Sequence, residues 1–298
     1  MKTISGNPQM IDESILGSVG KGRDNIIQDF LKSAFISRQY KLLPDMSISL
    51  IDENVLLRNR EDIPVWIHDC TIVQIVNCGI TDFKLPMSAK TVILEDCKNL
   101  KNIIGVEGAI IDELIIKDCE NVDISTLTNV EIKKVRLYQC GINSLKGLES
   151  VLRVLSVKRC KRLRDWDLVN KNNPVIKLEN CPINTFSQPL TSNSVTITNL
   201  KKAVYLDVKI GAVEDLRIED CSDIQELKIS GSKLSTLVVD NCESLEKVET
   251  VDCTSSASFV NLPKIEEYIL PPTITGACVF ENVNTVPEVK CKRKIVRK

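Results

Sequence analysis

The chain has 298 residues, of which 43% are hydrophobic and 27% are charged, and its formal net charge is −1. It contains no apolar run of about eighteen residues, and no apolar stretch after Lys2 resembles a signal peptide. The sequence therefore predicts a soluble protein with no transmembrane segment, located in the cytoplasm or another reducing compartment.

Residues 1–64 are predicted to form an N-terminal helical cap region. Between residues 24 and 43, apolar side chains recur at the spacing of a helix, as at Ile27, Leu31 and Phe35. The segment lacks the repeat that fills the rest of the chain. A stack of repeats exposes an apolar surface at each end, so a cap at this position is expected.

Residues 65–289 repeat one short phrase about every twenty residues. Apolar residues stand five and three places before a slot, and the slot itself is also apolar. Eight copies have a cysteine in the slot: Cys78, Cys97, Cys119, Cys140, Cys160, Cys181, Cys221 and Cys242. Three more copies end at Leu200, Leu262 and Val283.

The repeated phrase predicts a solenoid. Apolar residues two places apart describe a short strand with one buried face, and stacked copies make a parallel sheet. Two further apolar residues return after the slot, as Ile80 and Phe83 do after Cys78. The whole phrase, L-x-L-x-x-C-x-x-L-x-x-L, resembles the leucine-rich repeat, particularly its cysteine-containing type with short repeats.

The resemblance implies an α/β solenoid. It would be an arc of about eleven coils with a parallel inner sheet, a convex side that is mostly irregular or 3₁₀, and a helical N-terminal cap. The resemblance also implies a non-catalytic scaffold or adaptor that binds another protein on the inner face of the solenoid.

A parallel β-helix is the alternative architecture, with a regulatory role of the cytoskeletal or GTPase-cofactor type. Its coils have a similar length and can carry an Asn-Cys dipeptide at corresponding places, as at Asn77-Cys78 and Asn241-Cys242. The apolar pair that follows the slot favours the leucine-rich repeat, since a β-helix coil needs further regular strands.

Catalysis, metals and cofactors are not expected. The chain has one histidine, His68, and no pair of cysteines at the spacing of zinc ligands. A His–Cys pair with Cys70 would need a third orienting group, which the sequence does not supply. The twelve cysteines are predicted to be free of disulfides, and those of the slot column to be buried thiols.

The residue before the slot is Asn or Asp in nine of the eleven copies. Short polar side chains cap the backbone where a strand ends, so we interpret this column as structural. Gln139 and Arg159 break the column in consecutive coils. Six cations and no acid occupy residues 153–164, which indicates either a site for an acidic segment of a partner or an ordinary solvated charged surface. The predicted partner-binding residues are Arg136, Tyr138, Lys158, Arg159, Lys177 and Glu179.

Residues 290–298 form a basic tail with six cations and no acid. The tail is predicted to be a solvated terminus, while binding to nucleic acid or to an anionic membrane, and a nuclear location, stay open alternatives.

Overall fold

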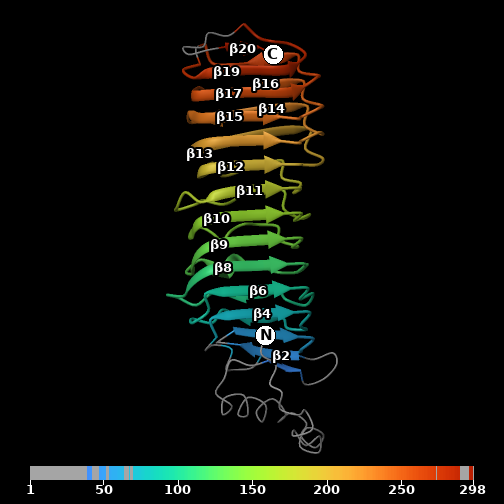
Figure 1. The fold of residues 1–298 in the computed structure, drawn as a ribbon, viewed down its shortest axis with the longest axis vertical. Coiled ribbons are helices and arrows are strands. Elements are labelled where there is room, and N and C mark those ends of the chain that lie inside the picture. The colour runs from blue at the N-terminus through green and yellow to red at the C-terminus, as the bar shows by residue number, and fades with distance from the viewer. Residues whose placement is uncertain are drawn as a thin grey trace, which may run out of the picture.

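The computed structural model describes residues 39–41, 47–51, 54–63, 67, 70–272, 274–288 and 295–297. Over these residues the chain is a parallel β-solenoid of about 11 turns. Figure 1 shows the turns stacked in a column along the longest axis of the molecule.

One face of the column is a continuous parallel ladder, here called the main ladder. Each strand pairs with the strand of the next turn. Its strands are β3 (Asn54–Arg58), β4 (Ile72–Val76), β6 (Thr91–Glu95), β8 (Ile110–Lys117), β9 (Glu131–Tyr138), β10 (Val151–Lys158), β11 (Val175–Glu179), β12 (Leu190–Thr198), β13 (Tyr205–Glu219), β15 (Leu234–Asp240), β17 (Cys253–Leu262), β19 (Ala277–Val283) and β20 (Ile295–Arg297).

A second set of parallel pairings runs along another face of the column. In the N-terminal half, β5 (Asp82–Lys84) pairs with β7 (Asn102–Ile104). In the C-terminal half the first part of β13 continues into a ladder with three strands. They are β14 (Glu226–Gly231), β16 (Lys247–Glu249) and β18 (Glu267–Ile269). At the N-terminal end, β1 (Gln39–Lys41) and β2 (Ser47–Ile51) add antiparallel pairings onto β3.

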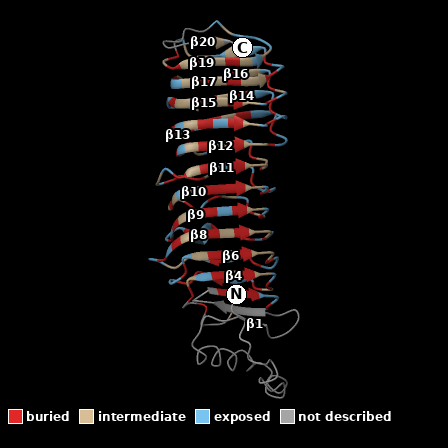
Figure 2. Cartoon of the chain, in the orientation of Figure 1, coloured by how far each residue is buried: buried red, intermediate tan, exposed pale blue. Residues whose placement is uncertain are grey.

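Alternation along each strand explains the single elongated core. In β6, Val92 and Leu94 are fully buried, while the other residues of the strand stay partly exposed. The same alternation recurs in successive turns, so the inward side chains stack into one apolar cluster that runs along the column (Figure 2). The eight predicted slot cysteines are all buried and free, as expected. Their thiols donate weakly to strand carbonyls, for example from Cys119 Sγ to the Lys117 carbonyl oxygen over 3.4 Å.

The solenoid prediction is confirmed, but the helical part of the α/β label finds no support among the described residues. There the assigned helix is short and of the 3₁₀ type, as in η3 (Ser125–Leu127). The predicted helix over residues 24–43 falls largely outside the described residues, and at its end Gln39–Lys41 forms a strand instead. His68 also lies outside the described residues.

The sequence phrase missed one turn of the solenoid. Strand β3 lies inside the predicted cap and pairs in parallel with β4. Asn59 follows the strand with a positive φ, as one residue does at the strand end of the later turns up to β19. Its slot is filled by Arg60, whose side chain is only 2% exposed and donates to Asp62 Oδ1 over 2.9 Å. A charged residue in the slot hid this copy from a search for apolar residues.

Two further predictions need correction. In the basic tail, Ile295–Arg297 pairs in parallel with β19, so this part of the tail extends the main ladder rather than fraying. Cys278 is disulfide-bonded, whereas the other ten described cysteines are free. The expectation that no cysteine is linked is therefore wrong at Cys278.

Candidate partner-binding site

The six predicted binding residues lie together at the C-terminal half of β9, β10 and β11. The sheet register aligns Arg136 with Ser156 and Ser156 with Lys177. It also places Tyr138, Lys158 and Glu179 in one row of neighbouring strand ends. Arg159 follows directly after the last residue of β10. Sequence spacing alone predicted this grouping, because equivalent positions of successive turns become neighbours in a parallel ladder.

Two of the predicted cations are already paired with carboxylates. Arg136 Nε lies 2.7 Å from Glu113 Oε1, and Lys158 Nζ lies 2.5 Å from Glu179 Oε2. Both pairs are partly exposed and each contributes about 0–1 kcal/mol to stability. They reduce the positive charge that the strand face can offer to an acidic partner.

Arg159 is held by the tyrosine of the preceding strand. Its Nη1 donates to the Tyr138 hydroxyl oxygen over 2.6 Å, and its guanidinium carbon lies 5.5 Å from the centre of the Tyr138 ring. Both side chains remain accessible to solvent at the end of the ladder. The pair orients an exposed cation without cancelling its charge.

From β3 to β19, every main-ladder strand has a residue of positive φ at its end. This residue directly follows the strand from β3 to β15, and in β17 and β19 it is the second-to-last strand residue, Asn261 and Asn282. The angles lie between 49° and 56°, the left-handed region that Asn and Asp adopt more readily than other residues with side chains. Successive Asn and Asp side chains also bond to each other, as Asn241 Nδ2 does to Asp220 Oδ1 over 2.7 Å. The column is therefore structural, as predicted, and we call it the Asx ladder.

Gln139 and Arg159 are the two interruptions of the Asx ladder, with φ of 56° and 55°. A long side chain in this conformation costs on the order of 1 kcal/mol, and it forgoes the bond to the neighbouring ladder residue. Two adjacent turns thus keep unfavourable residues at the place where the cations gather.

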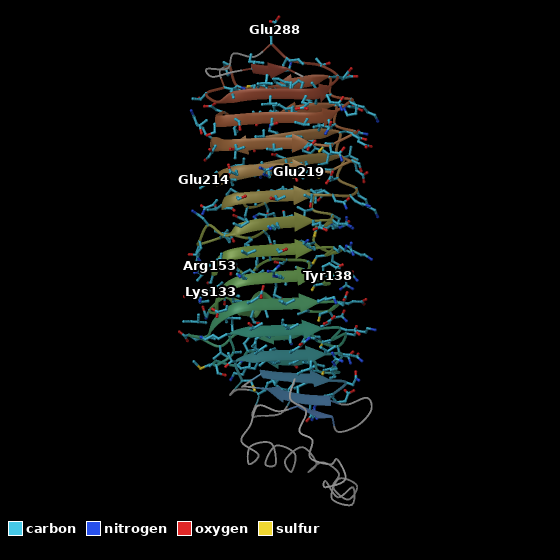
Figure 3. The ribbon with its side chains drawn as sticks, viewed as in Figure 1. Lys133, Tyr138, Arg153, Glu214, Glu219 and Glu288 are labelled. Carbon is cyan, nitrogen blue, oxygen red and sulfur yellow. The ribbon has the colours of Figure 1, made fainter. Side chains whose placement is uncertain are left out.

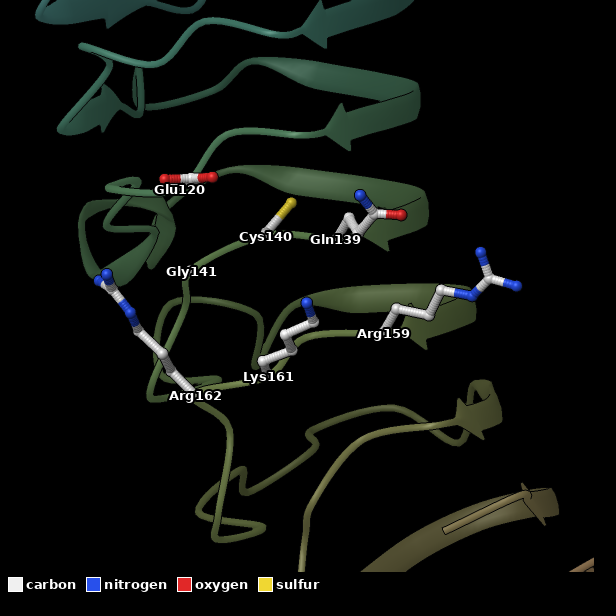
Figure 4. Close-up of a pocket in the computed structure, with 7 residues that line it drawn as sticks. All are labelled: Glu120, Gln139, Cys140, Gly141, Arg159, Lys161 and Arg162. Atoms are coloured by element: carbon white, nitrogen blue, oxygen red, sulfur yellow. The ribbon is translucent and has the colours of Figure 1, made fainter. Parts of the chain in front are cut away.

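A cavity of about 220 Å³ opens beside these two interruptions (Figure 4). Three consecutive turns supply its walls. Its lining residues are Glu120, residues 139–141, Arg159, Lys161 and Arg162. In Figure 4, Lys161 and Arg162 reach toward the turn at Gly141, whereas the guanidinium of Arg159 points away along the edge.

The turn at Gly141 packs closely against the turn before it. The Gly141 amide donates to the Cys119 carbonyl oxygen over 3.1 Å. A Cβ at Gly141 would lie 1.6 Å from the Glu120 carbonyl oxygen, so no other residue fits without a shift of the backbone. Glycine also leaves no side chain between Glu120 and Lys161.

Arg159, Lys161 and Arg162 together form what we call the basic edge. Within the described part of the chain, none of the three makes an ion pair with a carboxylate within 4.0 Å. Lys161 and Arg162 belong to the cationic window found in the sequence, but they were absent from the predicted site. The glycine after the slot, Gly141, and the break in the Asn/Asp column are the sequence signals that could have identified them.

The cationic window 153–164 does not form one surface. Figure 3 shows Arg153 with Lys133 at the N-terminal ends of the strands, across the face from Tyr138. Lys133 is bound there to Asp112 over 2.6 Å. Hydrogen bonding from Lys133 is the main reason that the pKa of Asp112 is lowered from its usual range, and Arg153 adds to this effect. Arg153 therefore belongs to a different cluster.

The Cys160 thiol, next to the basic edge, is poorly suited to nucleophilic chemistry. Hydrogen bonding with the Cys140 thiol, together with burial, raises the pKa of Cys160 to about 12. A thiol with this pKa stays protonated near neutral pH. Among the described residues, no group of three or more His, Cys, Asp or Glu side chains is arranged to hold a metal ion.

Comparisons with protein-family models, curated proteins and solved structures find no match to this chain. In the part of the chain that the structure describes, no helix combines the length and apolarity needed to cross a membrane.

Proposed function

We propose that the protein is a non-catalytic interaction scaffold that binds an acidic segment of another protein at the basic edge. The observation that carries this proposal is the coincidence of the two Asx-ladder interruptions with three unpaired cations and a cavity. A purely structural turn would keep Asn or Asp at residues 139 and 159. Placing Arg159 there costs stability and gains an oriented positive charge.

The binding surface is the edge of the solenoid rather than the middle of its strand face. Arg136 and Lys158 are matched by Glu113 and Glu179, whereas no described carboxylate lies within 4.0 Å of the cationic groups of Lys161 and Arg162. An incoming acidic segment therefore gains most from the turns that follow β9 and β10. Tyr138 contributes an aromatic surface beside Arg159.

A parallel β-helix regulator of the cytoskeletal or GTPase-cofactor type is the second candidate function. The regular strands of the second ladder, in β5, β7, β14, β16 and β18, support this architecture over the leucine-rich repeat. A β-helix requires such strands on a further face, and their presence removes the argument against it that was based on the apolar pair after the slot. Both architectures are compatible with binding at the basic edge.

The disulfide at Cys278 bears on where the protein works. Bonds of this kind are maintained mainly in oxidising compartments, whereas the free, buried thiols fit either environment. The disulfide thus does not support the cytoplasmic location, which stays a prediction from the sequence.

Charge reversal at the basic edge tests the proposed function. We expect Lys161→Glu combined with Arg162→Glu to weaken binding of a labelled peptide of alternating Glu and Asp residues by ~10-fold or more, measured by fluorescence anisotropy. Both side chains are exposed, so the unfolding midpoint of the variant is expected to change little.

The chain offers a matched control for this pair. Lys201 and Lys202 occupy the same two positions after the slot residue Leu200, and they do not line the cavity. Lys201→Glu combined with Lys202→Glu alters the net charge equally and should leave much more of the binding intact. Equal loss in both double variants would mean that the peptide senses only the overall charge, and the proposed site would be wrong.

A further inference from the structure

The cavity at the basic edge carries a specific balance of charge. Lys161 and Arg162 direct two positive charges toward the turn at Gly141, the guanidinium of Arg159 points away along the edge, and Glu120 contributes one negative charge. Gln139 and Gly141 are neutral. A partner carboxylate carries one negative charge for these two cations, whereas a doubly charged group carries one for each.

The two cations inside the cavity differ in the contacts that they can make. Arg162 offers a planar guanidinium that bonds to two oxygens of one anionic group, while Lys161 offers a compact point charge. Both come from the same turn after β10, and Figure 4 shows both side chains directed toward the turn at Gly141. An anion with several oxygens could accept from both residues at once.

Phosphate monoesters meet these requirements. At neutral pH such a group carries a charge of about −1.5 to −2 and three acceptor oxygens, compared with one charge and two oxygens for a carboxylate. The cavity has a volume of about 220 Å³ and opens to solvent at the basic edge. A side chain of a partner segment that lies across the turns can therefore enter it.

We propose that the cavity binds a phosphoserine or phosphothreonine side chain of the partner. This inference rests on the proposed function and specifies its ligand: a phosphorylated acidic segment rather than an acidic one alone. Arg162 and Lys161 donate to the phosphate oxygens, and Arg159 attracts the flanking acidic residues from its position over Tyr138. Glu120 lies on the opposite wall, where its carboxylate can accept from a backbone amide of the bound segment.

Peptide binding to the full chain tests this assignment. The probes are three labelled peptides with the same Glu-containing flanks and a central phosphoserine, serine or glutamate. We expect the phosphoserine peptide to bind ~10-fold or more tightly than the glutamate peptide, and the serine peptide to bind most weakly. In a spectrum of the isotope-labelled protein, the Gly141 amide signal should shift with the phosphoserine peptide.

Variants separate the cavity from general attraction. Arg162→Ala should remove most of the preference for phosphoserine over glutamate, whereas Lys202→Ala, at the equivalent second position after slot residue Leu200 two turns away, should retain it. Glu120→Gln should tighten binding of the phosphoserine peptide several-fold, because it removes the negative charge nearest to the phosphate.

Three outcomes would overturn the phosphate assignment. One is equal affinity for the phosphoserine and glutamate peptides. A second is an unchanged preference in Arg162→Ala. The third is inorganic phosphate binding as tightly as the phosphoserine peptide, which would show that the cavity takes the free ion and the partner segment adds nothing. Equal affinities that both fall on charge reversal of Lys161 and Arg162 would reject the phosphate and leave the proposed acidic-partner function standing.

Discussion

Asp252 is a carboxylate whose surroundings stabilise its charged form. Its side chain accepts from the Thr275 amide over 2.9 Å, from the Thr275 hydroxyl over 2.8 Å and from Lys233 Nζ over 3.0 Å. Burial alone would raise the pKa of Asp252, but these donors outweigh burial and hold the pKa below its ordinary value of 3.8. The charged Asp252 side chain therefore connects its turn with the preceding turn, through Lys233, and with the following turn, through Thr275.

We predict a pH-dependent loss of stability in Asp252→Asn. A depressed folded-state pKa stabilises the fold fully above the unfolded pKa, and this contribution disappears as the pH falls through the lower folded value. The variant should lose about 1–3 kcal/mol of unfolding free energy at neutral pH. In urea titrations its difference from the wild type should shrink as the pH is lowered below 3.8. A difference that is constant across this range would show that the charge of Asp252 is not involved.

Residue-level prediction worked where one side chain has one physical role. The burial of the thiols could be predicted because they occupy the apolar slot of the repeat. The structural role of the Asn/Asp column could be predicted because short polar side chains cap the backbone where a strand ends. The left-handed backbone of the Asx-ladder residues was not predicted. Capping and positive φ both favour Asn and Asp, so the presence of these residues does not distinguish the two. Arg60 was missed because it is a charged residue in a slot that is apolar in the other turns, and periodicity does not reveal that its side chain is buried and bonded to Asp62.

At the scale of elements, the turns rather than the strands create the candidate site. The strands after which the cations lie are members of the main ladder, with their apolar pair buried as in their neighbours, although Ser156 of β10 is buried as well. What differs is the turn at Gly141, which approaches the backbone of Glu120 too closely for a side chain. Changing this glycine should alter the cavity without touching a charge.

Gly141→Ala is predicted to destabilise the protein by about 1–3 kcal/mol, because the added methyl group overlaps the Glu120 carbonyl oxygen and the turn has to shift. Chemical denaturation would measure this change, and the acidic peptide should bind the variant more weakly. Ser222→Ala is the control at the equivalent position after Cys221, and it should change stability by less than about 0.5 kcal/mol. If Gly141→Ala is as stable as the wild type, the close approach of the two turns is wrong.

The main ladder was predictable from the sequence and the second ladder was not. Main-ladder strands carry the repeated apolar pair, which specifies both their position and their register. Several second-ladder strands, such as β5, β16 and β18, have three residues each, too few to show alternation. Their pairing follows from the stacking of complete turns, so it becomes visible only in three dimensions.

At the scale of the whole molecule, each turn depends on its neighbours for burial. One coil of about twenty residues cannot offset the cost of ordering its own backbone, so stability comes from contacts between turns. The Asx ladder is one such contact, and it stops at Gln139 and Arg159. This interruption is visible in the sequence. The unpaired cations and the cavity beside it could not be predicted, because they depend on how neighbouring turns align.

The account predicts that restoring the Asx ladder separates stability from binding. Gln139→Asn combined with Arg159→Asn would place ladder residues between Asp118 and Asn180 in the conformation that they favour. The double variant should gain about 1 kcal/mol or more, even though it loses the contact between Arg159 and Tyr138. Lys202→Asn is the control, because Lys202 also has a positive φ, of 68°, but lies away from the cavity.

The most direct measurement determines the unfolding free energy and the acidic-peptide affinity of these two variants side by side. The account predicts that both variants are more stable than the wild type and that binding weakens only when residues 139 and 159 are changed. A restored ladder that binds the peptide as tightly as the wild type, or that is less stable, would contradict the claim that this edge gives up stability for recognition.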